Sequence, residues 1–258
     1  METEMQRVVS VARAAAGLIL ANGGETCRAE DTASRIGRAF GYDMDIVALP
    51  TGVTMTVSKD GESVSSIARV KSRTVDLTRL EQVNGVSRAL AAHEMTLEEA
   101  ERAMKAIAEA KGPGFWRSVL AAGGSAAMFA VMFGGGWFEF LIAGLVGAAV
   151  HAVLRRMPEQ AAASLDCLIG GFMAAALALA ASAACGRGNV SLIIWSIMMP
   201  QLPGLAFTNG IRDSMRGDMV SGGARVSDAV MRAVVLAGGA GIAMWCYLRL
   251  GGAATWLR

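Results

Sequence analysis

The sequence has few of the residues that build metal, redox and nucleotide sites. It holds 2 His and 4 Cys among 258 residues, and the cysteines are far apart with no CxxC pair. This spacing predicts neither a zinc site nor a disulfide framework. We find no GxGxxG, P-loop or GxSxG motif, and no nucleophile–base pair. We therefore expect no metal, no cofactor and no enzymatic activity.

Charge is also scarce. Charged residues make up 18% of the chain, against about 25% in an ordinary soluble protein. The net charge is +2, and no basic stripe is interleaved with aromatic residues, so we expect no nucleic-acid partner. The N-terminus is acidic where a secretory signal would be basic, which predicts that there is no cleaved signal peptide.

The charges that exist are unevenly distributed. Residues 1–116 contain 14 Lys/Arg and 16 Asp/Glu, whereas residues 117–258 contain 10 and 6. A Gly-Pro-Gly sequence at 112–114 ends a helical pattern at the change. We predict two domains, a cytosolic α+β domain over residues 1–112 and a transmembrane domain over residues 113–258.

The first predicted domain has a readable order of elements. Two helical patterns are followed by three β-prone runs, which "PTG" and "KDGE" separate as turn and hairpin signals. Two more helical patterns come next, the second opening with the capping box Thr96-x-x-Glu99. The predicted order is ααβββαα, with the strands forming an antiparallel meander.

Opposite charges alternate along the second of these helical patterns. Glu25, Arg28, Asp31 and Arg35 are three, three and four residues apart, so they would share one helix face. Such a ladder is either a solvated, salt-bridged face or a contact surface. Exposed pairs contribute little stability, so stability alone does not explain it.

The second half of the chain is apolar enough to cross a bilayer several times. A span needs roughly 20 mostly apolar residues, and we predict five spans, at about 118–136, 137–154, 164–184, 189–209 and 230–250. Their Gly and Ala content indicates a multi-helix assembly. With the first domain inside, seven Arg flank the spans on the inner side and three on the outer side. This bias predicts a cytoplasmic N-terminus and an external C-terminus.

The fourth predicted span contains helix-breaking residues. Pro200, Pro203 and Gly204 interrupt it, and Gln201 and Asn209 add polar groups. Discontinuous helices build midplane sites in many transporters. A kink that only shapes packing is the alternative.

A charged stretch follows this break. Arg212 and Arg216 would share one face, with Asp213 and Asp218 close by. Residues 221–223, Ser-Gly-Gly, suggest a flexible, anion-friendly backbone before Arg225. The stretch is either a loop whose arginines enforce orientation, or a gate or vestibule for an anionic or zwitterionic solute.

Three more ionisable residues lie in or beside predicted spans. Glu139, His151 and Asp166 are candidates for proton coupling, since ionisable groups at membrane depth are usually functional. Each could instead be a structural residue near an interface.

Several motifs resemble those of a known family. "NGGETCRAEDT" (22–32), "ALPTGVTMTV" (48–57), "RVKSRTVDLTRLEQVNGVSR" (69–88) and "PGLAFTNGIRDSMRGDMVSGGAR" (203–225) are similar to motifs of the threonine/serine exporter family, and more closely of its short YjjP-type subunits. They run in order through both predicted domains.

The resemblance implies a cytosolic α+β domain followed by about five spans. It implies a bacterial inner-membrane location and a separate small YjjB-type membrane subunit as partner, with a homo-oligomer as the other possibility. It also implies export of threonine and serine, or of succinate in split systems, driven by the proton gradient.

Our leading hypothesis is a subunit of a secondary active exporter of a small polar metabolite. The solute would bind near Pro200 to Asn209, with the charges of 212–218 at the entrance. Five residues of the first domain would gate that entrance or join subunits, namely Glu25, Arg28, Asp31, Asn84 and Arg88. A non-transporting regulatory or scaffold subunit is the alternative.

Overall fold

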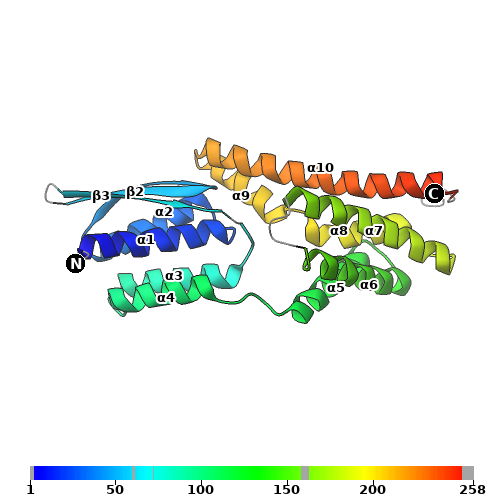
Figure 1. Ribbon diagram of the computed structural model, residues 1–258, viewed down its shortest axis with the longest axis horizontal. Helices are drawn as coiled ribbons and strands as arrows, with labels where there is room; N and C mark the ends of the chain where they lie inside the picture. The colour runs from blue at the N-terminus through cyan, green and yellow to red at the C-terminus, as the bar shows by residue number, and fades with distance from the viewer. Residues whose placement is uncertain (1–2, 60–61, 72, 158–162, 252–258) are drawn as a thin grey trace. The chain divides into compact units, whose positions relative to one another are not determined.

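The computed structural model describes residues 3–59, 62–71, 73–157 and 163–251 (Figure 1). The chain packs as two compact units. The first unit contains Met1–Lys111 and Leu205–Ser227, and the second contains Gly112–Gly204 and Asp228–Arg258. Each unit has its own hydrophobic core.

The first unit begins with seven elements in the predicted order. They are α1 (Glu4–Ala21), α2 (Thr26–Ala39), β1 (Asp43–Leu49), β2 (Gly52–Lys59), β3 (Glu62–Arg69), α3 (Leu77–Ala91) and α4 (Leu97–Glu109). Helices α1 and α2 form a middle layer, with the sheet on one side and the α3–α4 pair on the other (Figure 1). The ααβββαα order is confirmed.

The sheet is the predicted antiparallel meander, with the strand order β1-β2-β3. Asp45 pairs with Thr56, and Thr56 pairs with Ser65. On β2, Val53, Met55 and Val57 are buried toward the helices, so alternate residues face outward. Residues 60–61 of the predicted "KDGE" turn lie outside the described residues.

Helix α1 is central, because it packs on α2, α3, α4 and two strands. Val8, Ala12, Ala15 and Ile19 are all completely buried. The alanines allow close approach of neighbours on several sides, so α1 is apolar around most of its circumference.

The predicted capping box is confirmed at the start of α4. The Thr96 hydroxyl accepts the Glu99 N–H at 3.3 Å, and the Glu99 carboxylate accepts the Thr96 N–H at 2.8 Å. Two amide groups at the helix start are thereby satisfied.

The second half of the chain is helical. Its elements are α5 (Phe115–Met132), α6 (Trp137–Leu154), α7 (Ala163–Cys185), α8 (Val190–Met198), the 3-10 turn η1 (Met199–Gln201), α9 (Gly204–Met215) and α10 (Met219–Arg249). Among the described residues, four helices are long and apolar enough to cross a membrane, or five spans if the bent pair α8–η1 and α9 counts as one.

The interruption predicted in the fourth span is confirmed. The α-helix stops at Met198, Pro200 lies in η1, and a new helix begins at Gly204 with a bend of 56°. Pro203 has no N–H to donate to a preceding turn, which explains why the helix cannot continue through it.

The flexible Ser-Gly-Gly backbone predicted at 221–223 is wrong, because these residues lie inside α10. Gly222 allows close contact between α9 and α10. A Cβ there would lie 2.6 Å from the Gly210 carbonyl oxygen and 2.0 Å from the Ser214 hydroxyl. The glycine therefore permits two helices to touch. The interpretation of this glycine as a source of local flexibility overlooked that role.

Helices of the second unit also meet at glycines. A Cβ on Gly171 would lie 2.0 Å from the Leu236 carbonyl oxygen, and one on Gly239 would lie 2.1 Å from that of Leu168. Helices α7 and α10 thus touch backbone to backbone. This contact agrees with the assembly that the small-residue content indicated.

Helix α10 is longer than a bilayer span requires. Its 31 residues extend for roughly 46 Å at about 1.5 Å per residue, whereas a hydrocarbon core is about 30 Å thick. The excess is at its N-terminal end, where residues 219–227 belong to the first unit.

Candidate functional site

Residues 205–227 pack against the loop that joins α1 to α2, within the first unit. The Asn209 amide donates to the Gly23 carbonyl at 2.9 Å, and the Arg225 guanidinium donates to the Gly24 carbonyl at 2.8 Å. Gly23 has φ +86°, a left-handed conformation that favours glycine. The loop therefore turns its carbonyl groups toward α9 and α10.

Two further hydrogen bonds join α10 and its preceding turn to the same region. The Thr26 hydroxyl donates to the Asp218 carboxylate at 3.2 Å. The Ser221 hydroxyl donates to the Ala48 carbonyl at 3.4 Å. The 205–227 segment is thus attached by its side chains to both α2 and the end of β1.

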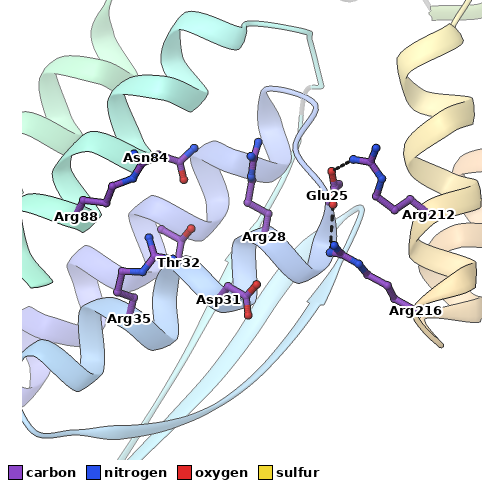
Figure 2. A pocket seen from close by; sticks show the side chains of 9 residues that line it. All are labelled: Glu25, Arg28, Asp31, Thr32, Arg35, Asn84, Arg88, Arg212 and Arg216. Atoms are coloured by element: carbon purple, nitrogen blue, oxygen red, sulfur yellow. Dashed lines mark hydrogen bonds and ion pairs between the residues drawn. The ribbon is translucent and has the colours of Figure 1, made fainter.

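Glu25 is the centre of an ion-pair cluster, which we call the Glu25 clamp (Glu25, Arg212 and Arg216). One carboxylate oxygen contacts the Arg212 guanidinium, and the other lies 3.3 Å from Arg216 (Figure 2). The Glu25 side chain is 13% exposed, whereas both arginines are about half exposed. Glu25 is the N-cap residue of α2 but makes no side-chain capping bond, so its carboxylate is free to reach α9.

The surroundings keep Glu25 ionised. Burial alone would raise its pKa, but hydrogen bonds from Arg212 and Cys27, together with the charges of Arg212 and Arg216, outweigh burial and lower the pKa. For Cys27 burial dominates, and the pKa of its thiol is raised despite the nearby Arg216. Glu25 is therefore ionised at neutral pH, beside a protonated thiol.

A second ion pair is buried behind the clamp. The Arg225 Nε lies 3.1 Å from the Asp213 carboxylate, and the two side chains are 7% and 0% exposed. The atoms are misaligned, and neither Asp213 oxygen has a hydrogen-bond donor among the described residues. Loss of either charge would leave the other buried without compensation.

Glu30 is a further carboxylate of this region, and its pKa is shifted in the direction opposite to that of Glu25. It accepts the Ala48 N–H at 2.8 Å. Burial raises its pKa, and although the Ala48 hydrogen bond lowers it, the charges of Asp218, Asp31 and Asp213 raise it further. Glu25 and Glu30 thus lie on one helix start with pKa values shifted in opposite directions.

A cavity of about 590 Å³ opens beside the clamp (Figure 2). Its lining residues come from α2 and its N-cap, from α3, and from the end of α9 with the turn that follows it. They are Glu25, Arg28, Asp31, Thr32, Arg35, Asn84, Arg88, Arg212 and Arg216. All five residues predicted as the interface of the first domain line this cavity, together with Arg212.

Of the two interpretations of the charged face of α2, the salt-bridged ladder is not formed. Within the described ranges, no ion pair joins Glu25, Arg28, Asp31 and Arg35 to one another. Glu25 precedes the helix and pairs with the arginines of α9 and its end, which are nearly 190 residues away in sequence. Helical spacing could not show this partner, because the contact is long-range.

The other sequence candidates lie in the second unit. Glu139 accepts the Gly136 N–H at 2.9 Å and the Asn189 N–H at 3.0 Å, so it caps α6 and the start of α8. His151 hydrogen-bonds to the Ser118 hydroxyl at 2.7 Å. These contacts give Glu139 and His151 structural partners that the sequence did not indicate.

Asp166 and Gln201 are held differently. One buried oxygen of Asp166 has no hydrogen-bond partner among the described residues. Gln201 donates to the Ile197 carbonyl at 3.2 Å, and Gly170 leaves room for its side-chain oxygen, since a Cβ there would lie 2.1 Å from it. In the described part of the chain, no group of three or more His, Cys, Asp or Glu side chains could hold a metal ion.

Sequence reasoning overlooked Thr26 and Glu30. Both lie on the face of α2 that meets the 205–227 segment and the end of β1. Their separation of four residues could have placed them on one face. Nothing local could have shown that Asp213 and Asp218 approach that face.

Comparison with known proteins decides the family. Residues 10–247 match the sequence model described as "Putative threonine/serine exporter". The chain belongs to the threonine/serine exporter family. The resemblance of the four motifs is thereby confirmed over most of the chain.

Three relatives in the threonine/serine exporter family are informative. A "Probable threonine/serine exporter" of Mycobacterium tuberculosis is 22% identical over 87% of this chain and 43% of its own length. A "Probable succinate transporter subunit YjjP" of Escherichia coli is 27% identical over 53% of this chain and 54% of its own. The subunit of the same name from Klebsiella aerogenes is 24% identical over 87% and 88%.

The extent of these matches differs. The chain spans about half the length of the first two relatives, at 43% and 54%, but most of the third. No solved structure gives a significant match. The threonine/serine exporter family is a transporter family. The several apolar helices of this chain make it a multi-pass membrane protein.

Proposed function

We propose that the chain is a subunit of a secondary active exporter for a small polar metabolite, with threonine and serine as the first candidates. The observation that carries the proposal is the family match over residues 10–247, together with the apolar helices of the second unit. The Mycobacterium tuberculosis relative bears the name of a threonine/serine exporter. The proton gradient of a bacterial inner membrane would drive the export.

The names of two relatives favour a second candidate, export of a dicarboxylate such as succinate. Both are called subunits, which supports a complex with another membrane protein of the YjjB type. We therefore propose that the transport pathway is completed by that partner rather than by this chain alone.

The two stretches of chain that make up the first unit support five spans. Residues 1–111 and 205–227 pack into one unit, so they lie on the same side of a membrane. The chain between them must then cross an even number of times. Helices α5, α6 and α7 would supply three crossings and α8 with η1 the fourth, because α9 belongs to the first unit, and α10 would be the fifth. More arginines flank the predicted spans on this side of the membrane than on the other side. This bias supports a cytoplasmic location for the first unit.

Within this proposal the Glu25 clamp acts as a gate. Its ion pairs involve half-exposed arginines, and such pairs are weak and can open at little cost. The Arg225 guanidinium, buried beside Asp213, also holds the segment through its hydrogen bond to the Gly24 carbonyl at 2.8 Å. The segment could therefore release at Glu25 while staying attached at Arg225.

The test is efflux from proteoliposomes that contain this chain and its YjjB-type partner. Vesicles loaded with labelled threonine, serine or succinate are placed in a pH gradient. Gradient-dependent efflux of threonine or serine is the expected result, and efflux of succinate alone would select the second candidate. Absence of flux for all three solutes would contradict the proposal.

Glu25→Gln tests the gate in the same vesicles. Removing the charge should change the efflux rate by about two- to fivefold, the kinetic equivalent of one weak ion pair. Glu98→Gln is the matched control, because Glu98 pairs with Arg7 at 2.8 Å and neither residue belongs to the clamp or lines the cavity beside it. If Arg212→Ala, Asp213→Ala and Asp218→Ala all leave flux unchanged in assembled complexes, the chain is a regulatory or scaffold subunit instead.

A further inference from the structure

The cavity beside the clamp has an unusual lining. Five of its nine side chains are arginines and two are carboxylates, and Thr32 and Asn84 complete it. We call it the arginine cavity. The formal charge of these nine residues is +3, and among the described residues no aromatic or long aliphatic side chain lines the cavity. A lining of this kind attracts anions and offers nothing for an apolar body to pack against.

Three of the arginines have no carboxylate partner. Among the described residues no acidic oxygen lies within 4.0 Å of the Arg28, Arg35 or Arg88 guanidinium, whereas Arg212 and Arg216 share Glu25. Each guanidinium carries five N–H donors in a planar fork. The cavity thus holds donor groups that fit carboxylate or phosphate oxygens and are not satisfied by this chain.

The donors surround the cavity from three helices (Figure 2). Arg28 and Arg35 are two turns apart on α2, a separation of about 10 Å along the axis. Arg88 approaches from α3, and Arg212 from α9. A ligand with one anionic group could contact the arginine at only one of these positions. A ligand with two or three anionic groups could bridge them.

We propose that the arginine cavity binds a small non-aromatic dianion or trianion, with phosphate or carboxylate groups that bridge the arginines of α2 and α3. The site shares Glu25, Arg212 and Arg216 with the proposed gate, but the inference rests on the lining of the cavity and not on the export proposal. A zwitterionic amino acid fits less well, because its ammonium group adds positive charge to a lining that already has an excess. A nucleotide fits less well too, because the described lining has no aromatic side chain against which a base could pack.

The test is calorimetric titration of the purified full chain in detergent at low salt. Inorganic diphosphate and citrate represent the phosphate and carboxylate forms of the ligand, with acetate and threonine as comparisons. We expect saturable binding of at least one polyanion at one site per chain, much weaker binding of acetate and threonine, and loss of affinity as salt is added. Binding of only one polyanion would identify which anionic group the cavity prefers.

Variants assign the binding to the cavity. Arg35→Gln and Arg88→Gln should each weaken binding by about tenfold, as expected for one charged hydrogen-bonding group. Asp31→Asn should strengthen binding about two- to threefold, because it removes a negative charge from the lining. Arg69→Gln is the matched control, since Arg69 is an exposed arginine at the end of β3 outside the cavity lining, and it should bind as the unaltered chain does.

The residues changed are exposed and form no ion pair within the described ranges, so the variants should keep the unfolding temperature of the unaltered chain. The proposal is overturned if neither polyanion binds saturably. It is equally overturned if folded Arg35→Gln and Arg88→Gln bind as tightly as Arg69→Gln, or if Asp31→Asn weakens binding. The measurement involves no flux, so failure here and failure of the export proposal are distinguishable.

Discussion

The two units hold their helices together by different means. In the first, the 205–227 segment is attached through ion pairs to Glu25 and through side-chain hydrogen bonds to the backbone carbonyls of Gly23 and Gly24. In the second, α7 and α10 touch through glycines at 171 and 239, with backbone atoms in direct contact. The first attachment depends on the presence of charge and the second on the absence of a Cβ.

The difference follows from what each unit must bury. Apolar helices that face one another in lipid gain little from hydrophobic association, so close packing has to hold them. The 205–227 segment carries charges onto a polar helix start, where charge pairing and backbone acceptors can specify one position. The two attachments should therefore fail under opposite kinds of substitution.

The largest expected effect is at the buried pair. Asp213→Ala leaves Arg225 buried without its counter-charge, and breaking such a pair costs about 3–5 kcal/mol. The double variant Asp213→Leu with Arg225→Met should lose much less, because no charge is left buried. Thermal unfolding in detergent measures both. Equal losses in the single and double variants would show that an uncompensated buried charge is not what destabilises the single variant.

A glycine comparison should give the next largest effect. Gly239→Ala places a Cβ against the Leu168 carbonyl oxygen, whereas nothing lies within 4 Å of a Cβ at the adjacent Gly238. We expect Gly239→Ala to destabilise by about 1–3 kcal/mol, as overpacking does. Gly238→Ala should be neutral or stabilising, since alanine favours a helix by about 1 kcal/mol over glycine. The same unfolding measurement applies, and indistinguishable variants would contradict close α7–α10 contact.

The smallest expected effect is a pH dependence at Glu30. Its pKa is raised above the ordinary value of 4.5, so the folded state binds the proton more tightly than the unfolded state. Stability from this group therefore increases as pH falls through the raised pKa toward 4.5. Glu30→Gln should flatten this slope and raise the unfolding temperature at pH 7 by about 1–2 °C. The amide oxygen can still accept the Ala48 N–H.

Glu25 contributes with the opposite sign. Its pKa is lowered, so its stabilisation is complete above 4.5 and is lost as pH falls below that value through the lowered pKa. The two glutamates thus act in separate pH windows. Glu94→Gln, at an exposed glutamate of the same unit, is the control for the Glu30 variant. A Glu30→Gln slope equal to that of the control would contradict the burial of Glu30 among carboxylates.

Much of the local structure could be predicted from the sequence. The ααβββαα order, the meander and the Thr96–Glu99 capping box depend on periodicity, turn residues and caps that act over a few positions. The break at Pro203 was equally local, because proline lacks the N–H that a helix needs. The five residues assigned to an interface of the first domain do share one cavity.

The sequence by itself determined the elements, the apolar helices and the family motifs, because these depend on neighbours along the chain. Only the tertiary structure decided that 221–223 is helical and that Glu25 pairs with Arg212 rather than with Arg28. The same holds for Asp213, whose partner Arg225 is buried with it. Each of these outcomes depends on which helices approach one another, and a pattern within one helix carries no information about the charge or the space that another helix provides.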